Sequence, residues 1–129
     1  MKTILLDTNV LLFDTLFPHR LSLRMKEVLF TENHFCCADI SLLEIATLIK
    51  KKRLHIQEPI DVFLNFVLNS RKTKVLPINS SIAALSQSLP IKHKDPADLL
   101  IIATALYYQV PLLTSDEVMR EVTGLNSIF

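Results

Sequence analysis

The sequence predicts an α/β fold with a central, mostly parallel sheet of four to five short strands that is flanked by helices. Two observations support this prediction. Short, continuously apolar runs alternate along the chain with longer segments of helical spacing, as in strands joined by crossover helices on both faces of a sheet. The 129 residues also fit one domain, and no linker, repeat or low-complexity segment divides them.

The strand predictions rest on short apolar runs that end at polar residues or at proline. The first run reads as a buried strand because its apolar residues are continuous rather than alternating. The third run stops before Pro77, and the last is expected at an edge of the sheet. The predicted strands are residues 2–6, 34–38, 75–76, 112–113 and 128–129.

The helix predictions rest on apolar residues spaced three and four apart and on residues that favour helix starts. Asn79 is a predicted N-cap, and Pro59 and Pro96 suit the first turn of a helix. The segment that begins at Pro96 is apolar on most sides, so we expect it to be the central helix. The predicted helices are residues 10–16, 21–30, 41–53, 58–68, 79–87 and 96–108, with one more helical turn at 116–121.

The composition excludes some classes of protein. The formal net charge is +1, so a nucleic-acid partner has to be argued from local features. The single glycine, Gly124, leaves no glycine-rich phosphate loop, which excludes nucleotide-binding Rossmann and P-loop domains. Hydrophobic residues make up 50% of the chain and the mean hydropathy is +0.34. We therefore expect some apolar surface to face a partner chain, with a rich core of fully buried strands as the alternative.

The two cysteines, Cys36 and Cys37, are adjacent in a predicted strand. Neighbouring side chains on a strand point to opposite faces, so we expect two buried thiols rather than a disulfide. Free thiols fit a reducing compartment, and the expected location is cytoplasmic. Asp7 interrupts the first apolar stretch, which is too short for a signal peptide or a membrane span, and we expect neither.

Four acidic residues share one predicted place in the fold. Asp7 and Asp116 follow predicted strands, and Glu44 and Asp98 open predicted helices. Ligands of open parallel sheets bind beyond the carboxyl ends of the strands, so we expect all four acids in one crevice. Clustered carboxylates repel one another, and one or two Mg²⁺ or Mn²⁺ ions relieve that repulsion. Because a metal-bound water is a better nucleophile, the chemistry that this cluster favours is phosphodiester hydrolysis.

Each of these acids also has a structural alternative. Residues 41–44 and 114–117 have the pattern of capping boxes. Asp95 before proline, with Asp98 in the first turn, is a favourable helix start. Asp7 differs because it ends an apolar run, where a polar residue is least expected without a function; its alternative role is to cap the following helix.

Four motifs follow one another along nearly the whole chain, at residues 5–12, 40–46, 93–105 and 112–116. The first contains Asp7-Thr8-Asn9 after an apolar run, and the third reads His-Lys-Asp-Pro-Ala-Asp before a long apolar helix. In this order the motifs resemble the PIN-domain family, and within it the VapC-like toxins of toxin–antitoxin pairs.

The resemblance implies a single PIN-like nuclease domain over residues 1–129. It implies a Mg²⁺- or Mn²⁺-dependent endoribonuclease that hydrolyses RNA, forms a homodimer and is held inactive by a cognate antitoxin. It also implies the site residues. The catalytic and metal-binding acids would be Asp7, Glu44, Asp98 and Asp116; Asn9 and Thr114 would be polar supports, and Asp95 a helix cap or a further support.

Two positions depart from the family's common pattern. Leu99 stands where many relatives have arginine after the third acid, and Leu43 stands where many have tryptophan before the second. Neither change removes a metal ligand. The missing arginine therefore affects substrate orientation or the antitoxin contact rather than the chemistry.

Two other functions can be weighed against the residues of the acid cluster. A receiver-type signalling domain needs a phosphoacceptor aspartate after a middle strand and a lysine near the crevice, and the sequence places neither clearly. A catalytically inactive PIN-like binding module is the other alternative, and the presence of all four acids argues against it. The basic residues at 50–53, 71–74 and 93–94 either contact RNA phosphates or are simply solvated.

Overall fold

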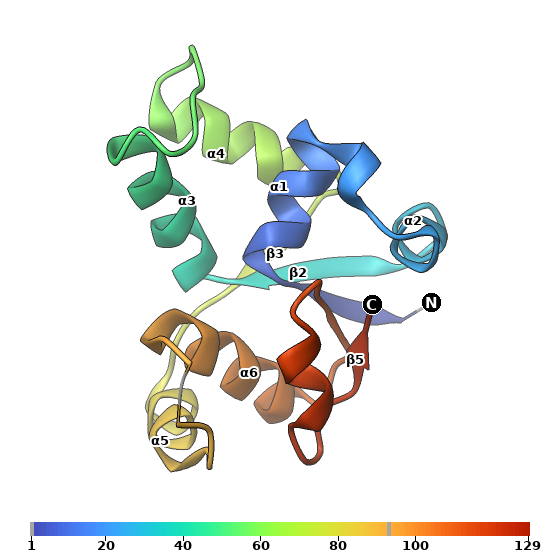
Figure 1. Ribbon diagram of the computed structural model, residues 1–129, viewed down its shortest axis with the longest axis vertical. Helices are drawn as coiled ribbons and strands as arrows, with labels where there is room; N and C mark the ends of the chain where they lie inside the picture. The colour runs from blue at the N-terminus through green and yellow to red at the C-terminus, as the bar shows by residue number, and fades with distance from the viewer. Residues whose placement is uncertain (1, 93) are drawn as a thin grey trace.

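The computed structural model describes residues 2–92 and 94–129, and its central feature is a five-stranded sheet (Figure 1). Neighbouring strands are paired in the order β3-β2-β1-β4-β5, and all four pairings are parallel. The predicted parallel sheet is confirmed, and each strand lies within one residue of its expected position. The strands are β1 (Thr3–Leu6), β2 (His34–Ala38), β3 (Lys74–Leu76), β4 (Leu112–Leu113) and β5 (Ser127–Ile128).

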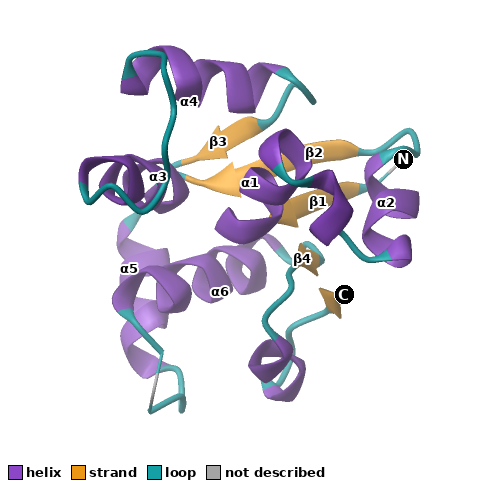
Figure 2. Cartoon of the chain, turned by 45° about the horizontal axis from the view of Figure 1, so that its top comes forward, coloured by secondary structure: helices purple, strands orange, loops and turns teal. Residues whose placement is uncertain are grey.

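Helices cover both faces of this sheet, as predicted (Figure 2). Ile4 and Leu6 of β1 pack against the core formed with α1 to α4, while Leu5 points to the opposite core, which contains α6. The α-helices are α1 (Thr8–Leu16), α2 (Leu23–Leu29), α3 (Ile40–Lys50), α4 (Ile60–Asn69), α5 (Ser80–Ser88) and α6 (Pro96–Tyr108), and two 3₁₀ helices are η1 (Pro18–Arg20) and η2 (Glu117–Glu121).

The helix α6 is central, as its apolar composition predicts. Ile101, Ile102 and Ala103 are fully buried, and the helix lies between the sheet and α5. Asp95 caps its first turn, because its side chain accepts a hydrogen bond from the Asp98 backbone N–H at 2.8 Å. The start of α6 is therefore held in place at the edge of the sheet.

Several predicted helix boundaries are wrong by two or three residues, including the starts of α2 and α4, which the sequence predicts at residues 21 and 58. The helix α1 begins at Thr8 rather than at residue 10, since Asp7 is its N-cap. The helix α3 ends at Lys50 rather than at residue 53, because Lys52 adopts a left-handed conformation with φ 59°. The Arg53 and Leu54 N–H groups then both bond the Leu48 carbonyl, which turns Leu54 into the core. The further helical turn predicted at 116–121 is confirmed, as the 3₁₀ helix η2.

The direction in which the strand order grows reverses between β1 and β4. β2 and then β3 lie on one side of β1. The next strand in the chain, β4, pairs with the other side of β1, and β5 lies beyond it. Open α/β sheets bind ligands beyond the carboxyl ends of the strands at such a reversal. A receiver-type domain has the order 2-1-3-4-5, so that alternative is wrong for this chain.

The two cysteine side chains lie on opposite faces of β2, as predicted. Both are free and buried, with Cys36 in the core of α6 and Cys37 in the core of α1. Burial raises the pKa of Cys36 to about 11 and the pKa of Cys37 to about 12, so both stay protonated. Among the described residues, none of the helices has the length and apolar character needed to span a bilayer.

Candidate active site

The four predicted acids lie near the carboxyl ends of β1 and β4. Asp7 follows β1, Asp116 follows β4, and Asp98 is in the first turn of α6. Glu44 lies on α3, and the negative charges of Asp98 and Asp7 both raise its pKa. Asp7 also raises the pKa of Asp98, so these three carboxylates are close enough to repel one another. The structure thus brings together residues that are up to 109 positions apart in the chain.

Asp7 is the most buried of the four acids, with 5% of its surface exposed. Its Oδ1 accepts a hydrogen bond from the Thr8 backbone N–H at 2.8 Å, and its Oδ2 accepts one from Thr114 Oγ1 at 2.6 Å. Burial raises the pKa of Asp7, although both hydrogen bonds act against that rise. Asp7 is therefore the N-cap of α1, which is the structural role that the sequence offered for it. It also places a buried carboxylate at the end of β1.

Glu44 is held by Thr8 rather than by a capping box. Thr8 Oγ1 donates to Glu44 Oε1 at 2.5 Å and lies 2.8 Å from Ser41 Oγ. The residue that opens α3 is Asp39, and Ser41 is fully buried within the first turn. The capping-box interpretation of residues 41–44 is therefore wrong, and Glu44 is free to face the other acids. Burial is the largest cause of its raised pKa.

Asp98 is a half-buried carboxyl in the first turn of α6. Burial, followed by the neighbouring charge of Asp95, raises the pKa of Asp98 to about 6. Asp95 thus has two effects at this position, since it also caps the helix through the Asp98 N–H. A carboxyl that loses its proton only near pH 6 is one for which a nearby cation brings a large gain in electrostatic energy.

Asp116 joins the cluster through Thr114. The Asp116 N–H donates to Thr114 Oγ1 at 3.0 Å, so one buried hydroxyl contacts both Asp116 and Asp7. Asp116 Oδ1 accepts from the Val118 N–H at 3.1 Å and caps η2, which replaces the capping box expected at residues 114–117. Its Oδ2 forms an ion pair with Lys94 Nζ.

The supporting residues differ in part from the predicted ones. Thr114 and Asp95 occupy supporting positions, whereas Asn9 is exposed and makes no hydrogen bond to an acid within the described part of the chain. Sequence reasoning missed Thr8, although it lies in the same Asp-Thr-Asn motif, and missed the ion pair of Lys94. His93 lies outside the described residues.

The chemistry of the donor set fits Mg²⁺ or Mn²⁺, because every donor of the cluster is a carboxylate oxygen and the carboxylates repel one another. As they stand, no three acid, histidine or cysteine side chains in residues 2–92 and 94–129 are grouped closely enough to hold a metal ion. Asp116, which is turned toward Lys94, is the acid with the clearest competing contact.

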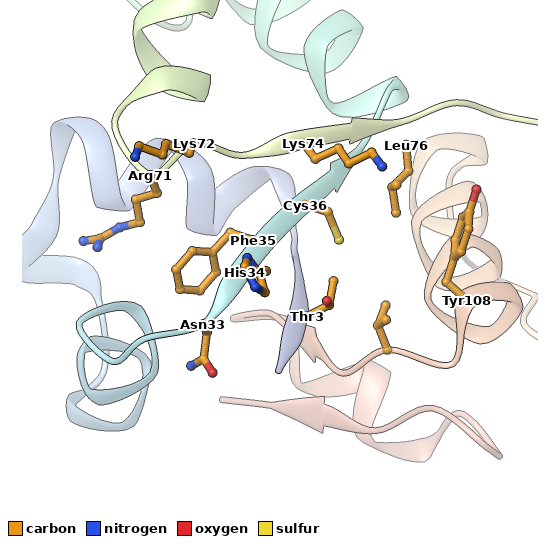
Figure 3. Close-up of a pocket in the computed structure, with 11 residues that line it drawn as sticks. Thr3, Asn33, His34, Phe35, Cys36, Arg71, Lys72, Lys74, Leu76 and Tyr108 are labelled. Atoms are coloured by element: carbon orange, nitrogen blue, oxygen red, sulfur yellow. The ribbon is translucent and has the colours of Figure 1, made fainter. Parts of the chain in front are cut away.

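A cavity of about 630 Å³ is a separate feature beside β1 to β3, and it extends from Thr3 and His34 at the starts of β1 and β2 to Leu76 at the end of β3 (Figure 3). His34, Lys74 and Tyr108 help to line it, and none of the four acids does. Arg71, Lys72 and Lys74 of the predicted basic segment all line the cavity, and Arg71 also pairs with Asp14 at 2.5 Å. This cavity is therefore distinct from the acid cluster.

Comparisons with known proteins agree with this architecture. The PIN domain family matches residues 4–125, which include all four acids. Ribonuclease VapC22 of Mycobacterium tuberculosis (strain ATCC 25618 / H37Rv) is 32% identical over 121 residues, which cover 93% of this chain and 92% of the relative.

Solved structures show the same fold at lower identity. The chain is similar to VapBC2 from Rickettsia felis bound to a promoter DNA fragment, with a TM-score of 0.75 and 18% identity over 98% of this chain and 97% of that one. It is also similar to DNA-bound VapBC from Salmonella typhimurium, with a TM-score of 0.69 and 18% identity over 99% and 98% of the two chains.

Proposed function

This chain belongs to the PIN-domain family and, within it, to the VapC ribonucleases, and we propose that it cleaves RNA at the cluster of Asp7, Glu44, Asp98 and Asp116. The observation that carries the proposal is the grouping of these carboxylates at the reversal of strand order, where burial raises the pKa of Glu44 and Asp98 and the neighbouring negative charges raise it further. Without a bound cation, such an arrangement is electrostatically unfavourable, so the fold maintains it against a cost.

Each acid has a proposed role. Asp7 and Asp98 hold the main divalent cation, Mg²⁺ or Mn²⁺, and Asp116 binds a second cation or tunes the first. When bound, the cation polarises the attacked phosphate and activates water. Glu44 completes the site or positions that water. Its Oε1 accepts a hydrogen bond from Thr8 Oγ1, and we propose that its Oε2 accepts a proton. Burial raises the pKa of Glu44, which makes its carboxylate a stronger proton acceptor.

The partners are proposed from the relatives. Solved neighbours include a toxin–antitoxin complex from Klebsiella pneumoniae and the VapBC complexes, so we propose that this chain is the toxin of such a pair and binds a cognate antitoxin. We further propose a cytoplasmic homodimer. Several large apolar side chains support the dimer because they are well exposed: Leu23, Phe30, Leu43, Val62 and Phe66.

Cleavage of total cellular RNA by matched variants tests this function. We expect Asp7→Asn to lower the cleavage rate at least ~100-fold at a fixed Mn²⁺ concentration, because a metal-bound nucleophile and the neutralised phosphate charge are lost together. Asp61→Asn makes the same chemical change at an exposed position on α4 and should cleave like the wild type. Full cleavage by Asp7→Asn with an intact fold would refute the assignment.

The remaining alternative is a binding module with this fold but no activity. It predicts that the wild type neither cleaves RNA nor binds Mn²⁺ or Mg²⁺ at millimolar concentration. Calorimetric titration with Mn²⁺ distinguishes the two, because the proposed nuclease has a site that Asp7→Asn weakens.

A further inference from the structure

Lys94 places a positive charge inside the acid cluster. It lies in the loop before α6, and its ammonium group pairs with Asp116 Oδ2. Only 11% of its side chain is exposed, although the neighbouring Lys92 in the same loop is exposed. Burial raises the pKa of Asp7 and of Asp98, and the positive charge of Lys94 opposes that rise at both. One lysine therefore reaches three of the four carboxylates.

The burial of this ammonium group has an electrostatic reason. A lysine side chain is flexible and strongly hydrated, so it leaves water only where a negative charge compensates it. The loop position does not force Lys94 inward, as the exposed Lys92 shows. Lys94 thus lies where a cation is favoured, which is also where the proposed divalent cation has to bind.

We propose that Lys94 is a built-in counter-cation of the acid cluster, which occupies Asp116 in the metal-free protein and has to leave it when a divalent cation binds. This inference rests on the proposed function. Lys94 and the divalent cation both require the Asp116 carboxylate, and two positive groups on one carboxylate repel each other. The other Asp116 oxygen already accepts the Val118 N–H, which leaves Oδ2 as the oxygen for which they compete.

Two consequences separate this role from that of a simple latch between the loop and η2. Without Lys94 the acids lose their internal positive charge, so the metal-free protein becomes less stable while its affinity for a divalent cation rises. A latch would instead stabilise the metal-free and the metal-bound protein equally, and its loss would leave the affinity unchanged or reduce it.

Calorimetric Mn²⁺ titration and thermal unfolding of four proteins test this inference: the wild type, Lys94→Met, Lys94→Arg and the control Lys92→Met. We expect Lys94→Met to bind Mn²⁺ about tenfold more tightly and to have a lower Tm in EDTA, with a Tm close to that of the wild type in saturating Mn²⁺. Lys94→Arg keeps the charge and should behave like the wild type, as should Lys92→Met.

The outcomes distinguish this inference from the proposed function. If the wild type binds Mn²⁺ and Asp7→Asn weakens that binding, but Lys94→Met binds no more tightly than the wild type, the role of Lys94 is refuted and the nuclease site stands. If none of the proteins binds Mn²⁺, both fail. A Lys94→Met protein that loses the same Tm with and without Mn²⁺ would identify a latch.

Discussion

Asp7 shows how one residue combines a structural and a proposed catalytic role. It caps α1 through Oδ1 and contacts Thr114 through Oδ2 while nearly fully buried. The sequence predicted its importance because a charged residue ends an apolar run. It could not predict Thr8 or Lys94 as neighbours of the acids, because a hydroxyl or an ammonium group gives no periodic signal and its direction is decided by contacts far along the chain.

The Thr114 hydroxyl group donates a hydrogen bond to Asp7 Oδ2 and so orients that carboxylate, and removing the hydroxyl tests this role. We expect Thr114→Val to weaken Mn²⁺ binding and slow RNA cleavage roughly 10–100-fold, because the buried Asp7 carboxylate loses a hydrogen bond that orients it. Thr114→Ser keeps the hydroxyl and should restore most of both. Calorimetry and cleavage rates measured on the three proteins check this, and a Thr114→Val protein with wild-type values would contradict it.

Asp98 makes the stability of the metal-free protein depend on pH. Its pKa rises from the model-peptide value of 3.8 to about 6 in the folded chain, so between these values the folded state binds more protons than the unfolded state. The stability contributed by protonated Asp98 is therefore lost as the pH rises from about 4 through about 6. In EDTA, the Tm of the wild type should fall more between pH 5 and pH 7.5 than the Tm of Asp98→Asn. Equal falls in thermal unfolding experiments would show that this carboxyl is not under electrostatic strain.

At the scale of elements, the starts of α3 and α6 decide where Glu44 and Asp98 lie. The sequence predicted α6 at its observed bounds, because Asp95, Pro96 and an apolar run all give the same signal. At α3 the local pattern was misleading. Ser41 and Glu44 match a capping box, but the helix begins one residue earlier and Ser41 is buried against Thr8. A contact between distant segments overrode the local pattern.

The cap of α6 gives a prediction for stability. Asp95→Ala removes the acceptor of the Asp98 N–H and should lower the free energy of unfolding by about 1 kcal/mol. Asp95→Asn keeps a good cap and should change that free energy by only a few tenths of a kcal/mol. Urea unfolding of both variants measures the difference; equal losses would show that the charge of Asp95, rather than its cap, stabilises the helix.

At the scale of the whole molecule, the alternation of strands and helices predicted a parallel sheet covered on both faces. The order of the strands was not predictable, because apolar runs of similar composition do not specify which neighbour they pair with. That order brings the ends of β1 and β4 side by side, and with them Asp7 and Asp116. The strand order thus determines that these acids lie close together, whereas the sequence shows only which acids follow strands.

The exposed apolar surface predicts self-association. Phe30 is 76% exposed and Phe66 is 60% exposed, on a chain that is half hydrophobic. We expect light scattering of the purified chain at micromolar concentration to give twice the mass of the 14.7 kDa protomer. A mass of one protomer under those conditions would leave this surface for the antitoxin alone and would contradict the homodimer.

The most direct test of the central claim is RNA cleavage by the purified chain before and after its divalent cations are removed. The acid cluster predicts that EDTA-treated protein does not cleave RNA and that added Mn²⁺ restores cleavage in the wild type but not in Asp7→Asn. Cleavage that continues at the same rate in EDTA, or that Mn²⁺ restores equally in Asp7→Asn, would contradict a metal-dependent nuclease site at these carboxylates.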